Sequence, residues 1–269
     1  MRLGLGSFAL AWAVGVPGYP PPARPLDAFG LLEAAREMGA TLVQFGDNLP
    51  LENLTPNELQ RLRREALDAG LALEIGCRGT SPDRLLSYLA IAQDLGTHLV
   101  RTLITEPGLP GLAAAEPDLR SALPSYERAG VTLAVENYDA HPVLAFAGLI
   151  RRVDSPSLGV CLDTLNSLGA LESPAAVIGE LLPLAVSIHV KDFTIRRVEH
   201  RMGFVVEGTP AGKGRLDIPG MIAEARAGGR DPGVVLELWT PWQGSIGATV
   251  ELEQAWARQS MSYLGRIVQ

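Results

Sequence analysis

The chain has 269 residues, 47% of them apolar and 20% charged, and a formal net charge of −7. This acidic balance argues against a nucleic-acid partner, because phosphate binding requires clustered lysine and arginine side chains. The length suits one large α/β barrel or two small domains. The two cysteines, Cys77 and Cys161, are too few for a disulfide framework and are expected to be reduced core thiols. No apolar run approaches the ~20 residues of a membrane span, so we expect no membrane contact and a cytoplasmic location.

Eight predicted strands alternate with eight predicted helices. The expected strands cover residues 3–9, 41–46, 71–77, 98–104, 131–137, 158–163, 185–192 and 234–239. The expected helices cover residues 26–38, 57–69, 82–95, 116–129, 142–153, 174–182, 218–227 and 248–267. This strict alternation predicts a single (β/α)8 TIM barrel formed by residues 1–269. The alternative is an open doubly wound sheet, but the first strand is not followed by the G-x-G-x-x-G signature.

Three segments each allow two interpretations. Residues 2–16, with an A-x-A site at 11–13, loosely imitate a secretory signal, but two interrupting glycines favour a first barrel strand over residues 3–9. Residues 15–25 are rich in proline, which precludes a helix, and they form either a cover over the site or a stiff surface loop. The connection 193–215 is expected to be a long loop. Its basic run at 196–201 is either a solvated face, a contact to an anionic substrate or a contact within a homo-oligomer, and its GKG motif at 212–214 lacks the spacing of a phosphate-binding P-loop.

Four consecutive predicted strands end in a residue that can bind a metal: Glu136, Asp163, His189 and Glu237. One register of the strands points all four into the barrel mouth and turns the large aliphatic side chains, Val186 among them, toward the helices. Three carboxylates in one mouth repel one another unless a cation lies among them. For any single carboxylate, a salt bridge to arginine or lysine is the alternative. The whole set predicts a site for one divalent ion, with Mn²⁺ as the first choice and Mg²⁺, Co²⁺, Fe²⁺ or Zn²⁺ also compatible.

Four short motifs carry a resemblance to a known family. They are VEN at 135–137, LDTLN at 162–166, IHVKD at 188–192 and LELW at 236–239. Together they resemble the xylose-isomerase-like TIM barrels, which include sugar isomerases, keto-sugar 3-epimerases, dehydratases, lyases and apurinic endonucleases. The resemblance implies that Glu136, Asp163, His189 and Glu237 bind one divalent metal and that Glu136 and Glu237 form the acid/base pair. The endonuclease branch, which holds three zinc ions with several histidines, fits poorly to an acidic chain with four histidines.

One position departs from the pattern of the epimerases. The resemblance to the epimerases implies a histidine three residues after the metal-binding aspartate. This chain has Asn166 at that position instead. Asparagine can donate a hydrogen bond to a substrate oxygen but cannot transfer a proton near neutral pH. The exchange argues against simple ketohexose epimerisation and leaves other keto-sugar or sugar-acid chemistry open.

These features predict a metal-dependent isomerase or epimerase that acts on a small sugar, keto-sugar or sugar acid through an enediolate. In such a reaction a divalent ion stabilises the enediolate, and carboxylates move the proton. A lyase or decarboxylase acting on a keto-sugar acid uses the same kind of intermediate and is the first alternative. The second alternative is a non-catalytic sugar-binding barrel, which would have no need for two metal-bound glutamates.

Further residues are expected to contact the substrate from inside the barrel mouth. These candidates are Asn166, Lys191, Arg101, Trp12 and Gln44. Each of three has a structural alternative: a salt bridge to Glu237 for Lys191, a pair with Glu74 for Arg101, and core packing for Trp12.

Overall fold

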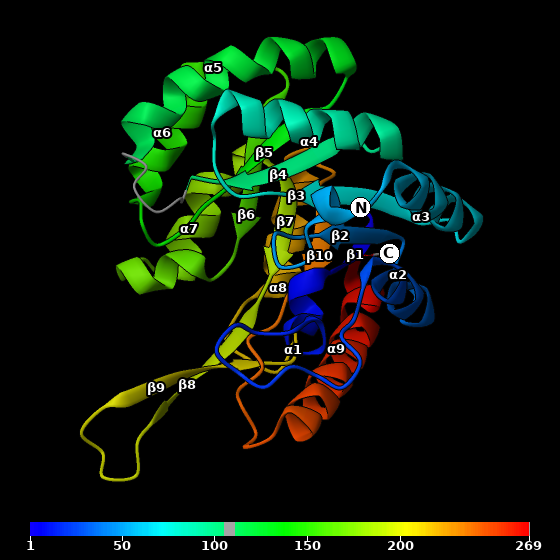
Figure 1. Ribbon diagram of the computed structural model, residues 1–269. Helices are drawn as coiled ribbons and strands as arrows, with labels where there is room; N and C mark the ends of the chain where they lie inside the picture. The colour runs from blue at the N-terminus through cyan, green and yellow to red at the C-terminus, as the bar shows by residue number, and fades with distance from the viewer. Residues whose placement is uncertain (105–110, 269) are drawn as a thin grey trace.

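The computed structural model describes residues 1–104 and 111–268, and it shows a closed barrel of eight parallel strands (Figure 1). Around the barrel the order is β1-β10-β7-β6-β5-β4-β3-β2. The strands are β1 Leu3–Gly6, β2 Leu42–Phe45, β3 Ala72–Gly76, β4 Leu99–Leu103, β5 Thr132–Glu136, β6 Leu158–Asp163, β7 Ala185–Val190 and β10 Gly233–Leu236. The predicted TIM barrel is therefore confirmed.

Helices surround the barrel and bury its outer face. They are α1 Ala11–Val14, α2 Ala28–Glu37, α3 Pro56–Asp68, α4 Pro82–Leu95, α5 Gly111–Ala129, α6 Val143–Val153, α7 Pro174–Leu181, α8 Ile218–Ala227 and α9 Ile246–Val268. Four 3-10 turns join them: η1 Ser7–Leu10, η2 Leu51–Asn53, η3 Asn166–Ala170 and η4 Leu182–Leu184. The aliphatic side chains on the outer face of the strands and on the inner faces of the helices form one continuous core. In the described part of the chain, no helix combines the length and apolarity needed to cross a bilayer.

Local sequence explains most helix boundaries. At the start of α3, Thr55 and Glu58 form a reciprocal capping box, in which Glu58 Oε2 accepts from the Thr55 backbone N–H at 2.8 Å. Ser81 is of a residue type that favours the N-cap of a helix, but its side chain makes no capping hydrogen bond to α4, whose boundaries are nevertheless the expected ones. Helix α5 begins at residue 111 instead of the expected 116, and Pro117 therefore lies inside the helix.

The first strand is shorter than expected because the chain turns at Ser7. Its hydroxyl accepts a hydrogen bond from the Gly46 N–H at 2.8 Å and donates to Asn48 Oδ1 at 2.5 Å. These two bonds tie the end of β1 to the loop after β2. Residues 7–10 consequently form the turn η1 instead of continuing the strand.

The connection after β7 contains a hairpin that the sequence analysis missed. Strands β8 (Asp192–Arg197) and β9 (Phe204–Thr209) pair in antiparallel fashion and extend away from the barrel (Figure 1). At its base the Asp192 carboxylate accepts four backbone hydrogen bonds, including those from Gly212 and Gly214, each at 2.9 Å. A Cβ at position 214 would lie 2.1 Å from Asp192 Oδ1. The amides of the GKG motif thus bind a carboxylate of the chain itself, which accounts for the glycines without a phosphate.

Strand β7 carries a β-bulge near its start. Its neighbour β6 aligns Val160 with Ala185 and Cys161 with Ser187, which leaves Val186 as one extra residue. Val186 packs inside the barrel, where a Cβ on Gly159 would lie 2.5 Å from its Cγ1. The expectation that Val186 faces the helices is therefore wrong, because the bulge interrupts the strict alternation.

Candidate metal centre

Four buried side chains from adjacent strands meet at the carboxyl end of the barrel. Glu136 is the last residue of β5, Asp163 is the last residue of β6, and Glu237 directly follows β10. His189 lies in β7 and is aligned with Asp163 on one side and Val235 on the other. Each of the four predicted ligands is at most 2% exposed. The structure therefore brings all four together.

The ring of His189 lies at the centre of this cluster. Its Nδ1 is 3.1 Å from Glu237 Oε1, 3.5 Å from Glu136 Oε1 and 3.8 Å from Asp163 Oδ2. Its Nε2 is 2.6 Å from Gln44 Oε1, on the opposite edge of the ring. One edge of the imidazole thus faces three carboxylates, and the other faces a neutral amide.

The ammonium of Lys191 lies between two of the carboxylates. Its Nζ is 2.8 Å from Asp163 Oδ2 and 2.8 Å from Glu237 Oε2, so the Lys191–Glu237 bridge considered from the sequence is present. Burial alone would lower the pKa of Lys191, but the charges of Asp163, Glu237 and Glu136 outweigh it and raise the pKa above its usual value. Lys191 is consequently protonated near pH 7.

Arg101 provides the second buried cation. Its Nε is 2.5 Å from Glu136 Oε2, and its Nη1 is 2.8 Å from Asp47 Oδ1. The expected pair with Glu74 is wrong, because the Glu74 carboxylate is used by other donors deeper in the barrel. Burial would raise the pKa of Glu136, but the charges of Arg101 and His189 outweigh it and hold this pKa far below its usual range. Glu136 is therefore a persistent carboxylate.

Asn166 links the two charged sides of the cluster. Its Nδ2 donates to Glu136 Oε1 at 2.7 Å, and its Oδ1 accepts from Lys191 Nζ at 3.1 Å. The backbone N–H of Asn166 donates to Asp163 Oδ1 at 2.7 Å, which anchors the turn η3 to the site. Both atoms of the Asn166 amide are thus oriented by charged neighbours.

The donor atoms of this cluster fit a divalent metal. Glu136 Oε2 and Asp163 Oδ2 each face a cation, whereas His189 Nδ1 is buried without a hydrogen-bond partner among the described residues. Buried polar atoms almost always have partners, so an open Nδ1 beside three carboxylates indicates a further positive group. Asp163, His189 and Glu237 offer donor atoms within 4.8 Å of one another. Two carboxylates and an imidazole at this spacing suggest a divalent ion.

Cys161 adds a donor that the sequence analysis assigned only to the core. Glu136, Cys161 and His189 form a second group of donor atoms within 4.8 Å of one another. Cys161 precedes Asp163 by two residues on the same inward face, so strand alternation was the signal that could have identified it. Burial raises the pKa of its thiol to about 11, and the group is therefore a neutral neighbour of the site near pH 7.

A cavity of ≈ 280 Å³ opens directly above the cluster. It is lined by Phe8, Arg78, Arg101, Leu103, Glu136, Tyr138, Asp139, Asn166, Gly169, Lys191, Glu237 and Trp239. Arg78 and Asp47 were not singled out from the sequence, and they form an ion pair of 2.9 Å at this rim. Asp47 follows β2 just as the candidate ligands end or follow their strands, so the same positional rule would have found it. The cavity is large enough for a small polar substrate beside the donor atoms.

Two of the expected substrate contacts lie elsewhere. Trp12 packs against Tyr19 and Trp242, with ring centroids 4.8 Å and 5.4 Å away, and its Nε1 donates to the Thr240 carbonyl. It is a packing residue that joins the 15–25 loop to the loop after β10, and neither Trp12 nor residues 15–25 line the cavity. Gln44 lies below His189 and is 1% exposed, so we replace its expected substrate contact by a positioning role.

We expect Arg101→Met to destabilise the fold. The substitution keeps an unbranched side chain but leaves the buried Glu136 carboxylate, and in part Asp47, without their cation. Removing one partner of a buried ion pair typically costs about 3–5 kcal/mol in the free energy of unfolding. Urea unfolding followed by circular dichroism measures this loss, with Arg151→Met as the control because Arg151 pairs with Glu180 at the surface. Equal stability of the two variants would contradict the assigned role of Arg101.

The sequence matches known proteins along nearly its whole length. The family model described as xylose isomerase-like TIM barrel matches residues 32–266. A relative from Pectobacterium atrosepticum, named 3-oxo-isoapionate decarboxylase, is 36% identical over 267 residues, which cover 98% of this chain and 95% of the relative.

Solved structures are similar in fold at low sequence identity. A D-psicose 3-epimerase from Clostridium cellulolyticum H10, solved with D-tagatose, superposes with a TM-score of 0.74 at 14% identity and full coverage of both chains. A xylose isomerase-like TIM barrel protein from Mycobacterium smegmatis, solved in complex with magnesium, gives a TM-score of 0.69 at 17% identity, with 98% of this chain and 97% of that chain covered. The chain belongs to the xylose isomerase-like TIM barrel family.

Proposed function

We propose that the protein is a divalent-metal-dependent decarboxylase that acts on a small 3-oxo sugar acid. The Pectobacterium relative, whose name states decarboxylation of 3-oxo-isoapionate, supports this reaction over the isomerisation or epimerisation predicted first from the sequence. The single observation that carries the proposal is the arrangement around Glu136. Arg101 and Asn166 occupy its two oxygens and keep it ionised, which suits a reaction that needs proton transfer from one side only.

The two reaction classes differ in their proton transfers. In a 3-oxo acid, the bond between the carboxyl carbon and C2 breaks, and its electron pair forms an enolate with the charge on the C3 oxygen. Carbon dioxide leaves, and one proton is then added to C2. Isomerisation and epimerisation instead require a base that removes a proton from carbon and an acid that returns one. A site with one competent proton donor is therefore sufficient for decarboxylation.

Lys191 is the proposed proton donor. It lines the cavity, it is held as an ammonium by Asp163 and Glu237, and its Nζ is 2.8 Å from Glu237 Oε2. On the opposite side Asn166 cannot transfer a proton near neutral pH, and Glu136 is a carboxylate without a proton to give. Lys191 would protonate C2 and recover its proton from solvent through the cavity, while its charge stabilises the enolate oxygen.

The proposed ligands of the divalent ion are Glu136, Asp163, His189 and Glu237, with Mn²⁺ as the first choice. When bound there, the ion would supply positive charge that stabilises the developing enolate oxygen. The chain itself keeps these donors in place by burying them and by holding Asp163 Oδ1 on the backbone of η3. Arg101 keeps Glu136 in the ionised form that a ligand must have.

Incubation of the protein with a 3-oxo sugar acid that carries carbon-13 in its carboxyl group tests the reaction. With Mn²⁺ present, we expect labelled carbon dioxide in a 1:1 ratio to the ketone product and, in D₂O, one enzyme-delivered deuterium at C2. The protein treated with a chelator is the control and should release carbon dioxide only at the uncatalysed rate. Retention of the labelled carboxyl group across a panel of such acids would refute a decarboxylase.

An isomerase or epimerase is the second candidate. The similarity of the fold to the D-psicose 3-epimerase favours it, as does the arrangement of Glu136 and Glu237 at the ends of different strands around the same cluster. Incubation with keto-sugars in D₂O distinguishes the two candidates, because an epimerase would incorporate deuterium next to the carbonyl without loss of carbon. We expect no such exchange.

A further inference from the structure

Below the candidate metal centre, His189, Gln44, Glu74 and Ser187 form a continuous chain of hydrogen bonds through the barrel interior. His189 Nε2 lies 2.6 Å from Gln44 Oε1, and Gln44 Nε2 lies 2.8 Å from Glu74 Oε2. Ser187 Oγ lies 3.2 Å from the same Glu74 oxygen. All four residues are at most 7% exposed, and Gln44 and Glu74 are aligned on neighbouring strands β2 and β3.

With Glu74 Oε2 as an acceptor, the hydrogen bonds in this chain run in one direction. Glu74 Oε2 accepts from both Gln44 and Ser187, so the Gln44 amide must present its NH₂ group to Glu74. The opposite orientation would place the Gln44 carbonyl against a carboxylate oxygen, with two acceptors in contact. The Gln44 carbonyl therefore faces His189, and the His189 nitrogen next to it, Nε2, must carry the proton.

A proton on Nε2 determines whether Nδ1, on the other edge of the His189 ring, has a lone pair for a metal. The lone pair of a neutral imidazole is then on Nδ1, the atom that faces Glu136, Asp163 and Glu237. Nδ1 is also the His189 atom that lacks a hydrogen-bond partner among the described residues. A metal requires this lone pair, so the interior chain of hydrogen bonds leaves Nδ1 as the nitrogen that a metal would bind.

We propose that Gln44 and Glu74 are positioning residues that fix the Nε2–H tautomer and the ring orientation of His189 for metal binding. This inference rests on the metal site of the proposed function but not on the reaction that the site performs. Neither residue lines the cavity above the cluster, so neither is expected to contact the substrate.

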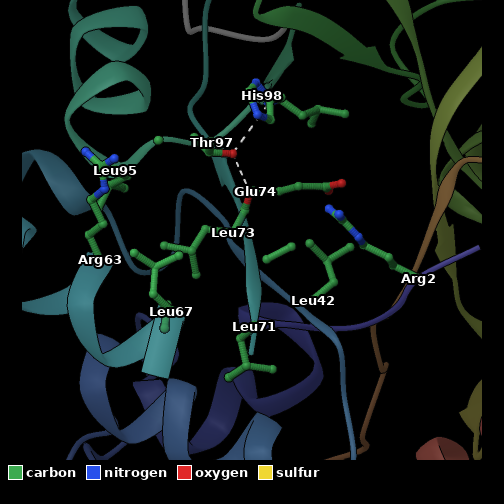
Figure 2. A pocket seen from close by; sticks show the side chains of 14 residues that line it. Arg2, Leu42, Arg63, Leu67, Leu71, Leu73, Glu74, Leu95, Thr97 and His98 are labelled. Atoms are coloured by element: carbon green, nitrogen blue, oxygen red, sulfur yellow. Dashed lines mark hydrogen bonds between the residues drawn. The ribbon is translucent and has the colours of Figure 1, made fainter. Parts of the chain in front are cut away.

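Glu74 is reached from the opposite end of the barrel. It borders a cavity of ≈ 250 Å³ at the amino ends of the strands, and Figure 2 shows its carboxylate and the Arg2 guanidinium turned toward the same part of that cavity. Burial raises the pKa of Glu74, while the bonds from Gln44 and Ser187 and the charges of His189 and Arg2 act against this. A proton on the other carboxylate oxygen, Oε1, would leave Oε2 as the acceptor for Gln44, so the direction of the chain is unchanged.

Zinc binding tests the proposal without reference to catalysis. Zn²⁺ affinity is measured by competition with a chromophoric chelator for the wild type, Gln44→Leu, Glu74→Leu and the exchanged pair Gln44→Glu/Glu74→Gln. We expect each single variant to bind zinc about 10–100-fold more weakly, which is the usual effect of losing a partner of a metal-binding histidine. The exchanged pair should recover to within a few-fold of the wild type, because the carboxylate at position 44 accepts from His189 and the amide at position 74 donates to it.

A matched control separates positioning from general damage to the interior. Glu253→Gln alters another buried carboxylate, which accepts from the backbone N–H groups of Trp12 and Ala13, and it should leave zinc affinity unchanged. In the zinc-loaded wild type, ¹H–¹⁵N NMR should place the remaining ring proton of His189 on Nε2. A ring proton on Nδ1, wild-type zinc affinity in both single variants, or failure of the exchanged pair to recover would overturn the proposal. Loss of carbon dioxide release with intact zinc binding would instead count against the proposed function alone.

Discussion

Glu237→Gln should abolish turnover while the barrel remains folded. Glu237 is 3.1 Å from His189 Nδ1 and 2.8 Å from Lys191 Nζ, so a neutral amide removes one proposed metal ligand and the partner of the proposed proton donor together. Loss of a single preorganised electrostatic or proton-transfer group typically costs 10²–10⁴-fold, and we expect about 10³-fold in kcat/KM. The rate of carbon dioxide release at saturating Mn²⁺ measures the effect.

The control for this substitution is Glu251→Gln on the exposed face of α9, which should have the activity of the wild type. Circular dichroism and the midpoint of thermal unfolding establish that both proteins are folded. A folded Glu237→Gln enzyme with more than a tenth of the wild-type kcat/KM would remove Glu237 from the site as we describe it.

Lys191→Met should separate metal binding from catalysis. The ammonium is 2.8 Å from both Asp163 and Glu237, so its removal leaves two buried carboxylates more negative and should tighten Mn²⁺ binding several-fold. The same substitution removes the proposed proton donor and a positive charge near the enolate oxygen, and we expect a loss of about 10²–10³-fold in kcat. Titration calorimetry with Mn²⁺ and the carbon dioxide assay measure the two effects.

The sequence provides an exact control for this experiment. Lys191 and Lys213 are the only lysines of the chain, and Lys213 lies exposed in the GKG motif. Lys213→Met should change neither Mn²⁺ affinity nor kcat. Weaker Mn²⁺ binding by a folded Lys191→Met protein would mean that the ammonium helps to hold the metal donors in place, and unchanged kcat would eliminate it as the proton donor.

The architecture was accessible from the sequence because it depends on local and periodic signals. Alternating apolar strands, prolines at helix starts and glycines at helix ends identify the eight β/α units, and four boundaries of α4 and α8 agree with the expected ones. The hairpin β8–β9 was missed for a physical reason. It packs little against the barrel, so its sequence carries no strong apolar alternation of the kind that marks a buried strand.

The site could be predicted only in part, because the ion pairs and hydrogen bonds between its side chains depend on the tertiary structure. Strand ends identify Glu136, Asp163, His189 and Glu237, since all carboxyl ends of parallel strands meet at one rim. The position of a residue at a strand end does not predict which side chain a charged or polar residue pairs with. Arg101 pairs with Glu136 and Asp47 instead of Glu74, and Gln44 serves His189 from below, because stagger between strands determines which inward side chains share a layer.

The bulge in β7 has a consequence for how such sequences must be aligned. With Val186 directed into the barrel, an unbroken two-residue alternation would put Ile188 inside and His189 against the helices. The bulge adds one residue to β7 and so shifts the alternation by one position, which places the His189 imidazole in the interior. Deleting Val186 would therefore give β7 a regular alternation, with Ala185 and Ser187 still opposite Val160 and Cys161 and His189 still facing the interior.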